Sequence, residues 1–210
     1  QIAYRYLLDD KGSEICYTYK QLDQHAQIIA SELTQRNMMG KRVLMLYPSS
    51  MDFITSFYGC LYAGVTAVPV YPPKRNQKIG RLRAIIDDCE PDWVMTTTRV
   101  IELAEPLFKE TPGLENLPWL TTDDLDYEQT ATWNCPDINE HTLAFLQYTS
   151  GSTGNPKGVM LSHNNLLKNT EANYSSKPIP PGVNGVSWLP LFHDMGLIGG
   201  VIWPLYGCFT

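Results

Sequence analysis

The sequence has little positive charge. Its Lys and Arg residues number 16 against 22 Asp and Glu, which gives a formal net charge of -6. Binding to a nucleic-acid backbone requires concentrated Lys and Arg. We therefore expect no nucleic-acid partner, and any anionic ligand has to be bound by a small local group of residues. One basic cluster is expected to be a solvated loop and helix face: Lys74, Arg75, Lys78, Arg81 and Arg83.

Long apolar runs and paired cysteines are also missing. No stretch approaches the roughly 18 apolar residues of a membrane span, and no secretory signal is evident. The five cysteines are odd in number and scattered, with no CxxC spacing, so we predict neither a disulfide framework nor a zinc site. These features indicate a cytoplasmic protein without a membrane span or a metal-binding cluster of its own.

The chain nevertheless contains enough apolar residues to form a core. With 210 residues, 43% of them hydrophobic, it has the size of one large domain or two small ones. Its two ends look interrupted, because Gln1 leads directly into a strand-like segment and residues 206–210 resemble the start of an apolar strand. We expect a fragment whose catalytic inventory is incomplete.

The spacing of apolar residues predicts alternating strands and helices, which is typical of an α/β fold. Strands are expected at residues 2–8, 15–19, 43–47, 65–70, 93–97, 143–148 and 159–161. Helices are expected at residues 22–36, 51–63, 79–89, 99–108 and 163–174. Ser162 is expected to cap the last helix. Residues 111–139 are rich in Pro, Asp, Thr and Asn, so we expect mostly connecting chain there and a subdomain boundary near 111–140.

The segment from Tyr148 to Gly158, YTSGSTGNPKG, has the composition of a phosphate-binding loop. It contains four hydroxyls, three glycines and one lysine within eleven residues. Glycines let backbone N–H groups approach an anion, hydroxyls donate hydrogen bonds, and a lysine supplies positive charge where negative charge develops. The combination predicts a site for a polyphosphate ligand.

Three other interpretations of this segment fit less well. A Walker loop has Gly before its lysine and a hydroxyl after it, whereas here Pro156 precedes Lys157 and Gly158 follows. The sequence has no GxSxG elbow, so the serines are not predicted to be hydrolase nucleophiles. A flexible Gly/Ser linker does not require hydroxyls bracketed by glycines and a Pro-Lys-Gly exit.

The longer segment YTSGSTGNPKGVMLSHNNL resembles the signature phosphate loop of the adenylate-forming superfamily, which includes acyl-CoA synthetases, luciferases and adenylation domains of peptide synthetases. A second block, WLPLFHDMGL at residues 188–197, is similar to a downstream motif of that superfamily in the form typical of fatty acyl-AMP ligases. The segment VPVYPP at residues 68–73 is similar to theirs too. The resemblance spans nearly the whole chain.

The fold implied by this resemblance is the first half of the family's large N-terminal domain, with layered, mostly parallel sheets and flanking helices. The family's later motifs are missing from these 210 residues. They include the adenine and magnesium segment, the ribose-binding Asp, the hinge and the small C-terminal domain with its catalytic Lys. The chain is thus expected to be a partial N-terminal domain without the C-terminal one.

The reaction implied by the resemblance joins a carboxylate and ATP to give an acyl-adenylate and pyrophosphate. Lys157 is expected to neutralise the phosphates, and Mg²⁺ to be bound through ligands mostly outside this chain. The β- and γ-phosphates are expected to be held by side-chain hydroxyls and glycine amides, at Thr149, Ser150, Gly151, Ser152, Thr153 and Gly154.

The pair His193-Asp194 is by itself as consistent with a structural role as with a functional one. The resemblance implies that His193 lies where the acyl pocket meets the nucleotide site and helps to position the carboxylate. Trp188, Phe192 and Met195 are candidates for lining that pocket, although core packing is the stronger expectation for any one of them.

The acceptor of the acyl group is left open between two alternatives. The resemblance favours a fatty acyl-AMP ligase that transfers a fatty acid to an acyl carrier protein, with an acyl-CoA synthetase as the alternative. A catalytically inactive binding fragment is the preferred interpretation for the isolated 210 residues. A phosphate-loop NTPase would hydrolyse ATP without any acid, and the order Pro156, Lys157, Gly158 argues against it.

Overall fold

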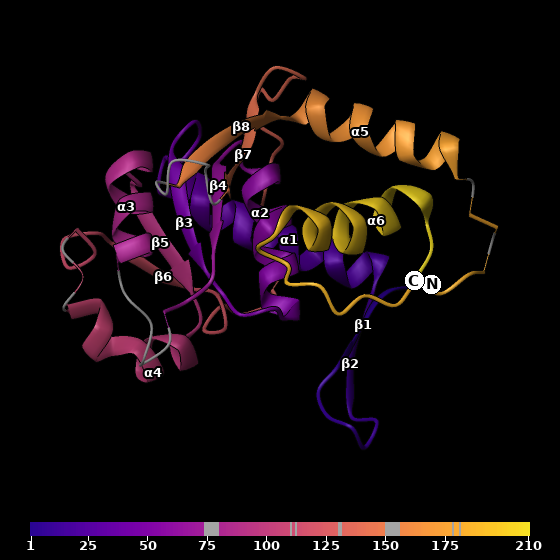
Figure 1. Cartoon of the computed structure of the whole chain (residues 1–210), viewed down its shortest axis with the longest axis horizontal. Coiled ribbons are helices and arrows are strands. Elements are labelled where there is room, and N and C mark those ends of the chain that lie inside the picture. Colours follow the sequence, from indigo (N-terminus) through magenta and orange to yellow (C-terminus); the bar gives the residue numbers. More distant parts are fainter. Residues whose placement is uncertain are drawn as a thin grey trace.

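A six-stranded, mostly parallel sheet forms the centre of the computed structural model (Figure 1). The structure describes residues 1–73, 80–109, 111, 113–129, 132–149, 156–177, 179–180 and 182–210. The strand order is β6-β5-β3-β4-β7-β8, and only the β7–β8 pair is antiparallel. The strands are β3 (Arg42–Leu46), β4 (Thr66–Val70), β5 (Trp93–Thr96), β6 (Trp119–Thr121), β7 (Leu143–Thr149) and β8 (Lys157–Ser162).

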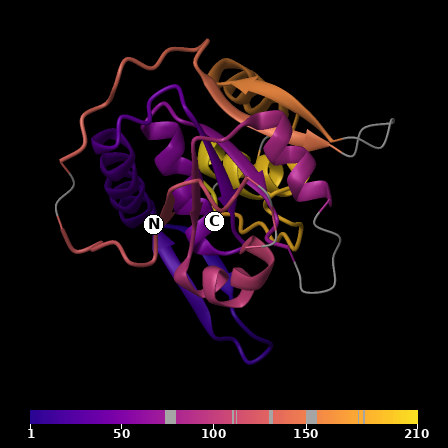
Figure 2. The ribbon, with the colours of Figure 1, turned by 90° about the vertical axis from the view of Figure 1, so that its left-hand side faces the viewer.

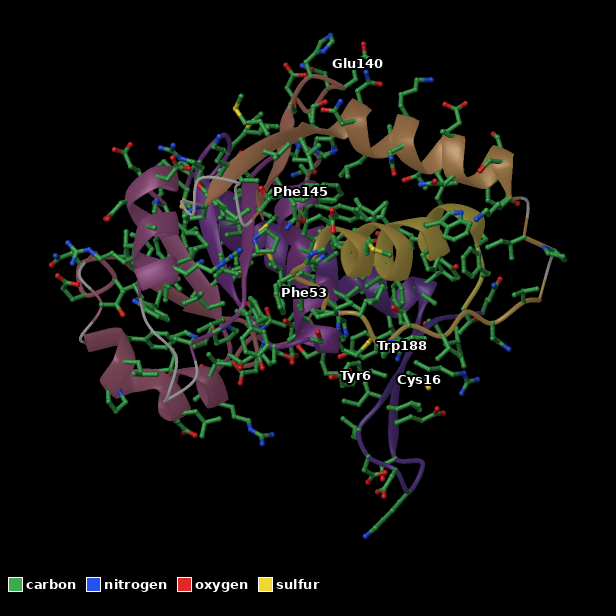
Figure 3. The ribbon with its side chains drawn as sticks, viewed as in Figure 1. Tyr6, Cys16, Phe53, Glu140, Phe145 and Trp188 are labelled. Atoms are coloured by element: carbon green, nitrogen blue, oxygen red, sulfur yellow. The ribbon has the colours of Figure 1, made fainter. Side chains whose placement is uncertain are left out.

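Helices cover both faces of this sheet. On one face lie α1 (Tyr19–Gln35) and α2 (Met51–Tyr62), and on the other lie α3 (Gly80–Cys89) and α4 (Thr98–Lys109) (Figure 1). Successive strand residues point to opposite faces, so Met45 joins the core under α1 and α2 while Leu46 joins the core under α3. Phe53 of α2 and Phe145 of β7 lie near the centre of the molecule (Figure 3) and are almost fully buried.

A β-hairpin outside the main sheet begins the chain. Its strands β1 (Ile2–Leu7) and β2 (Glu14–Thr18) are antiparallel, and their turn projects away from the body of the molecule (Figure 1). The two chain ends meet at the base of this hairpin. The Gln1 side-chain amide donates to the Cys208 carbonyl at 2.7 Å, and the Thr210 hydroxyl donates to the Ile2 carbonyl at 2.9 Å.

The connection between β6 and β7 runs around the outside of the molecule along α1 and α2 (Figure 2). The Trp133 ring stacks on Tyr62 with 5.0 Å between the ring centroids, and the Tyr127 ring lies 4.3 Å from the His25 imidazole. These aromatic contacts fix the connection against the helices.

Among the residues described after β8, there are three helical segments. They are α5 (His163–Ser176), the π-helix η1 (Met195–Ile202) and α6 (Trp203–Gly207). The Ser162 hydroxyl accepts from the Asn165 backbone N–H, and the Asn165 side chain accepts from the Ser162 backbone N–H, which completes a capping box. In the part of the chain that the structure describes, no helix has the length and apolarity needed to cross a membrane.

Most of the predicted elements are confirmed, including the hairpin, the β3-α2-β4 parallel crossover and the Ser162 cap. Two differences stand out. The strand β6 was not predicted, because its three residues lie in a segment dominated by turn-forming residues. The expected strand at residues 206–210 is wrong, since Trp203–Gly207 is helical and a left-handed Cys208 (φ 53°) ends that helix.

Candidate functional site

A cleft of about 720 Å³ opens where the parallel strands β4 and β7 end. Ligands of open α/β sheets bind outside the carboxyl ends of the strands, so this is the expected place for a site. The walls come from the ends of β4 and β7, from α3 and from the chain before η1. The cleft is lined by Ser49, Pro69, Val70, Tyr71, Pro73, Arg81, Leu82, Ile85, Gln147, Tyr148, Thr149, Trp188, Pro190, Phe192, His193 and Asp194.

The two ends of the predicted phosphate loop face each other across the β7–β8 hairpin. Thr149 is the direct cross-strand partner of Lys157, and Tyr148 is the partner of Gly158. Thr149 lines the cleft, whereas the exposed Lys157 is not among the described residues that line it. The other predicted phosphate-binding residues lie outside the described residues: Ser150, Gly151, Ser152, Thr153 and Gly154.

Tyr148 anchors the hairpin to α3. The Tyr148 side chain is largely buried, and its hydroxyl donates a hydrogen bond to the Asp88 carboxylate near the end of that helix. Burial, and then this bond to a carboxylate, raise the pKa of the Tyr148 phenol. The same ring lies against the backbone of Gly158, where an added β-carbon would be 2.9 Å from the tyrosine Cζ. One side chain thus fixes both stems of the loop relative to α3.

His193 and Asp194 form a close pair at the cleft. The His193 Nδ1 lies 2.5 Å from an Asp194 carboxylate oxygen, and the two side chains are 62% and 55% exposed. The same oxygen accepts from the Met195 backbone N–H at 2.7 Å, where η1 begins. The pair is therefore oriented by the start of η1 and remains accessible to a ligand in the cleft.

The chain just before this pair is held by the ends of three neighbouring strands. The Leu191 N–H donates to the Ser49 hydroxyl at 3.1 Å, and the Gln147 side-chain amide donates to the Phe192 carbonyl at 3.1 Å. The Phe192 ring meets Tyr71 edge to face, with centroids 5.1 Å apart. Ser49 follows β3, Tyr71 follows β4 and Gln147 belongs to β7.

The expected acyl-pocket residues separate into two groups. Trp188 and Phe192 line the cleft, whereas Met195 is not among the described residues that line it. Core packing is the wrong expectation for Trp188, which is 87% exposed on the chain leading to η1 (Figure 3), and for Met195, which is 65% exposed.

Sequence reasoning missed several residues that line the cleft, among them Ser49 and Gln147, and recognised only the exposure of Arg81. Arg81 is exposed, as expected, but it also lines the cleft. The one available signal for Gln147 is strand alternation, which was not applied to it: it follows Phe145 by two positions and so faces the same side of the sheet. Within the described residues, no three His, Cys, Asp or Glu side chains converge to hold a metal ion, so no metal ligand is assigned.

Proteins of known name are similar to this chain in sequence. The medium-chain-fatty-acid–[acyl-carrier-protein] ligase JamA of Moorena producens is 38% identical over 97% of the chain and 35% of its own length. The long-chain-fatty-acid–AMP ligase FadD32 of Mycolicibacterium smegmatis is 36% identical over 99% of the chain and 34% of its own length.

A crystal structure shows the same similarity. The fatty acyl-adenylate ligase of L. pneumophila, solved with acyl adenylate and pyrophosphate, superposes with a TM-score of 0.86 at 38% identity, over 97% of this chain and 35% of that one. The expected fold, the first part of the N-terminal domain of an adenylate-forming enzyme, is confirmed.

The chain spans about a third of the length of these relatives. The family described as AMP-binding enzyme matches residues 2–210. Because this match extends over nearly the whole chain, the protein belongs to the AMP-binding enzyme family.

Proposed function

We propose that this chain is the phosphate-binding part of a fatty acyl-AMP ligase, which activates a fatty acid with ATP for transfer to an acyl carrier protein. The observation that carries the proposal is the convergence of Thr149 and His193 on one cleft, with Lys157 opposite Thr149 across the hairpin. The names of the similar ligases support the choice of a fatty acid as substrate.

In the proposed reaction, a carboxylate oxygen of the fatty acid attacks the α-phosphorus of ATP. The bond from that phosphorus to the bridging oxygen breaks, and pyrophosphate leaves with the negative charge. Such transfers depend on positioning and on electrostatic stabilisation of the leaving phosphates. We assign phosphate binding to the Thr149 hydroxyl and the loop Ser150–Gly154, and neutralisation of the developing charge to the Lys157 ammonium.

We assign His193 to binding the second reactant, the carboxylate of the fatty acid. Its imidazole is exposed and lines the same cleft as the half-buried Phe192, so it is accessible to a carboxylate whose acyl chain lies against apolar surface. Asp194 fixes the ring through Nδ1, which leaves Nε2 available to the carboxylate. We propose that His193 orients the attacking oxygen, with Trp188 and Phe192 contributing to the acyl pocket.

Mg²⁺ is expected to accompany ATP, but the described residues offer no cluster of metal ligands, so no step of the proposed reaction is routed through it. All five cysteines are free, which suits a reducing compartment, and we propose that the reaction takes place in the cytoplasm.

The proposal is tested by acid-dependent ATP–pyrophosphate exchange in the full-length gene product. Removing one electrostatic stabiliser of a transition state commonly costs about 10²–10³-fold in rate, and we expect a loss of that order for Lys157→Ala. Lys168→Ala is the matched control, because Lys168 is an exposed lysine of α5 paired with Glu171 at 2.9 Å. Exchange that needs no fatty acid, or that survives Lys157→Ala unchanged, would disprove the assignment.

The acceptor is tested separately by product analysis. The wild-type enzyme is given ATP and a fatty acid with either CoA or a phosphopantetheinylated carrier protein. We expect the carrier protein to be acylated and no acyl-CoA to be formed. Formation of acyl-CoA at a comparable rate would favour the acyl-CoA synthetase over the carrier-protein ligase.

A further inference from the structure

The peptide group between Phe192 and His193 is held from both sides. Its carbonyl oxygen accepts from the Gln147 side-chain amide at 3.1 Å, and its N–H donates to the Pro190 carbonyl at 3.1 Å. A trans peptide is planar, with its oxygen and hydrogen on opposite edges. Two hydrogen bonds at opposite edges therefore fix the orientation of the plane, and with it the direction in which the His193 side chain leaves the backbone.

Gln147 is an unusual residue for its position. It lies in the buried strand β7 and is only 6% exposed, between the apolar Leu146 and the buried Tyr148. Its Oε1 has no hydrogen-bond partner among the described residues. A buried acceptor without a partner destabilises a fold, so an apolar side chain of similar length, such as methionine, would be more favourable for packing alone. Among the described contacts, the benefit that only a carboxamide gives is the bond to the Phe192 carbonyl.

We propose that Gln147 is the positioning residue of His193. It acts through the Phe192–His193 peptide and does not itself contact the reacting atoms. The inference rests on the proposed function, in which His193 orients the carboxylate. A displacement of about 1 Å at a reacting group can cost on the order of 10²-fold in rate. We therefore expect Gln147→Met to lower kcat of fatty acid activation by roughly 10- to 100-fold, with the KM for ATP almost unchanged.

A double-mutant cycle in the full-length gene product separates positioning from simple destabilisation. Residues that act through one another are not additive, so Gln147→Met should have almost no further effect in a His193→Ala background. The control Gln24→Met, at an exposed position of α1, should leave kcat unchanged in both backgrounds. A normal kcat in Gln147→Met, or a loss that adds fully to that of His193→Ala, would overturn the inference.

A second measurement does not depend on activity. In protein labelled with ¹⁵N-histidine, Gln147→Met should shift the His193 amide resonance and speed its hydrogen exchange, while the His163 amide in the capped start of α5 stays unchanged. An unaltered His193 amide would refute the positioning role even if the enzyme activates fatty acids. A different result is that the His193 amide exchanges its hydrogen faster in Gln147→Met while the wild-type enzyme shows no acid-dependent ATP–pyrophosphate exchange. That result would retain the positioning role of Gln147 and reject the proposed function.

Discussion

Gly196 lies directly against the backbone of Pro190. A β-carbon added to Gly196 would be 2.1 Å from the Pro190 carbonyl oxygen and 2.7 Å from its carbonyl carbon. The same carbonyl oxygen accepts from the His193 N–H. The glycine of the motif at residues 193–197 thus allows the first turn of η1 to close onto the turn that carries His193.

Replacing Gly196 with alanine should disturb both stability and activity. The clash is with backbone atoms, which cannot rotate away, so we expect a loss of about 1–3 kcal/mol in the free energy of unfolding, typical of an overpacked site. The midpoint of thermal unfolding should fall by several degrees, and acid-dependent pyrophosphate exchange should fall with it.

Gly199→Ala is the matched control for Gly196→Ala. Both glycines belong to η1, but a β-carbon at Gly199 would meet nothing within 4 Å. We expect this variant to keep the wild-type unfolding midpoint to within a degree or two. Equal losses in the two variants would mean that the helix, and not the contact with Pro190, is sensitive to substitution.

Gly158→Ala should destabilise the β7–β8 hairpin. The added methyl would meet the Tyr148 ring, which cannot move freely because its hydroxyl is bound to Asp88. We expect a loss of about 1–3 kcal/mol in urea unfolding. Gly80→Ala serves as the control, since a β-carbon there meets nothing within 4 Å.

The origin of the Gly158 effect is checked by shortening its neighbour. Tyr148→Leu removes the ring atoms that the new methyl would meet, so the two substitutions together should cost less than the sum of their separate effects. Full additivity would show that the loss arises in the backbone of Gly158 and not in the contact with Tyr148.

The stability of the protein should fall as the pH drops below about 6.5. Burial lowers the pKa of both His25 and His163, although Glu128 opposes this at His25. The unfolded chain then takes up protons at these imidazoles before the native state does, so the free energy of unfolding decreases towards acid. Urea midpoints measured between about pH 7 and pH 5 should show this slope.

Two variants assign this slope to the half-buried histidines. His25→Gln combined with His163→Gln should flatten the dependence, while His141→Gln, at a side chain that is 83% exposed, should leave it intact. A slope that persists undiminished in the double variant would place the acid sensitivity in the carboxylates.

The isolated chain of 210 residues should form no acyl-adenylate. It contains the predicted phosphate loop and the residues that line the cleft, while the similar ligases are about three times longer. Mass spectrometry after incubation of residues 1–210 with ATP and a fatty acid tests this. Any fatty acyl-AMP above the background of a Lys157→Ala chain would show that the chain contains a complete catalytic site.

The sequence predicted the elements whose apolar spacing is regular. The segments around Leu44 and Val68 read as buried parallel strands because each is a short apolar run followed by a turn signal. Local sequence patterns did not predict the elements that depend on contacts with segments distant in the sequence. β6 is only three residues long and pairs with β5, and the first turn of η1 places Gly196 directly against the backbone of Pro190.

As with the fold, local sequence patterns indicated some residues of the candidate site and not others. The hydroxyl, glycine and lysine content of the loop pointed to Thr149 and Lys157, which the hairpin register then placed opposite each other. Gln147 could not be found in this way, because its significance lies in a hydrogen bond to a carbonyl 45 positions away. A contact of that range appears only when the end of β7 and the chain before η1 are placed in space.

The β7–β8 hairpin also bears on the source of positive charge for the proposed phosphate ligand, which can be a helix N-terminus or a side chain. In a strand–loop–helix site, the fixed partial charge of a helix N-terminus points at the anion. Here α5 begins beside the Leu143–Ser162 pair, at the far end of the hairpin from Thr149 and Lys157. Under the proposed function, Lys157 and not the N-terminus of α5 supplies the full positive charge at the loop, and its four-carbon stem allows the ammonium to follow a departing pyrophosphate.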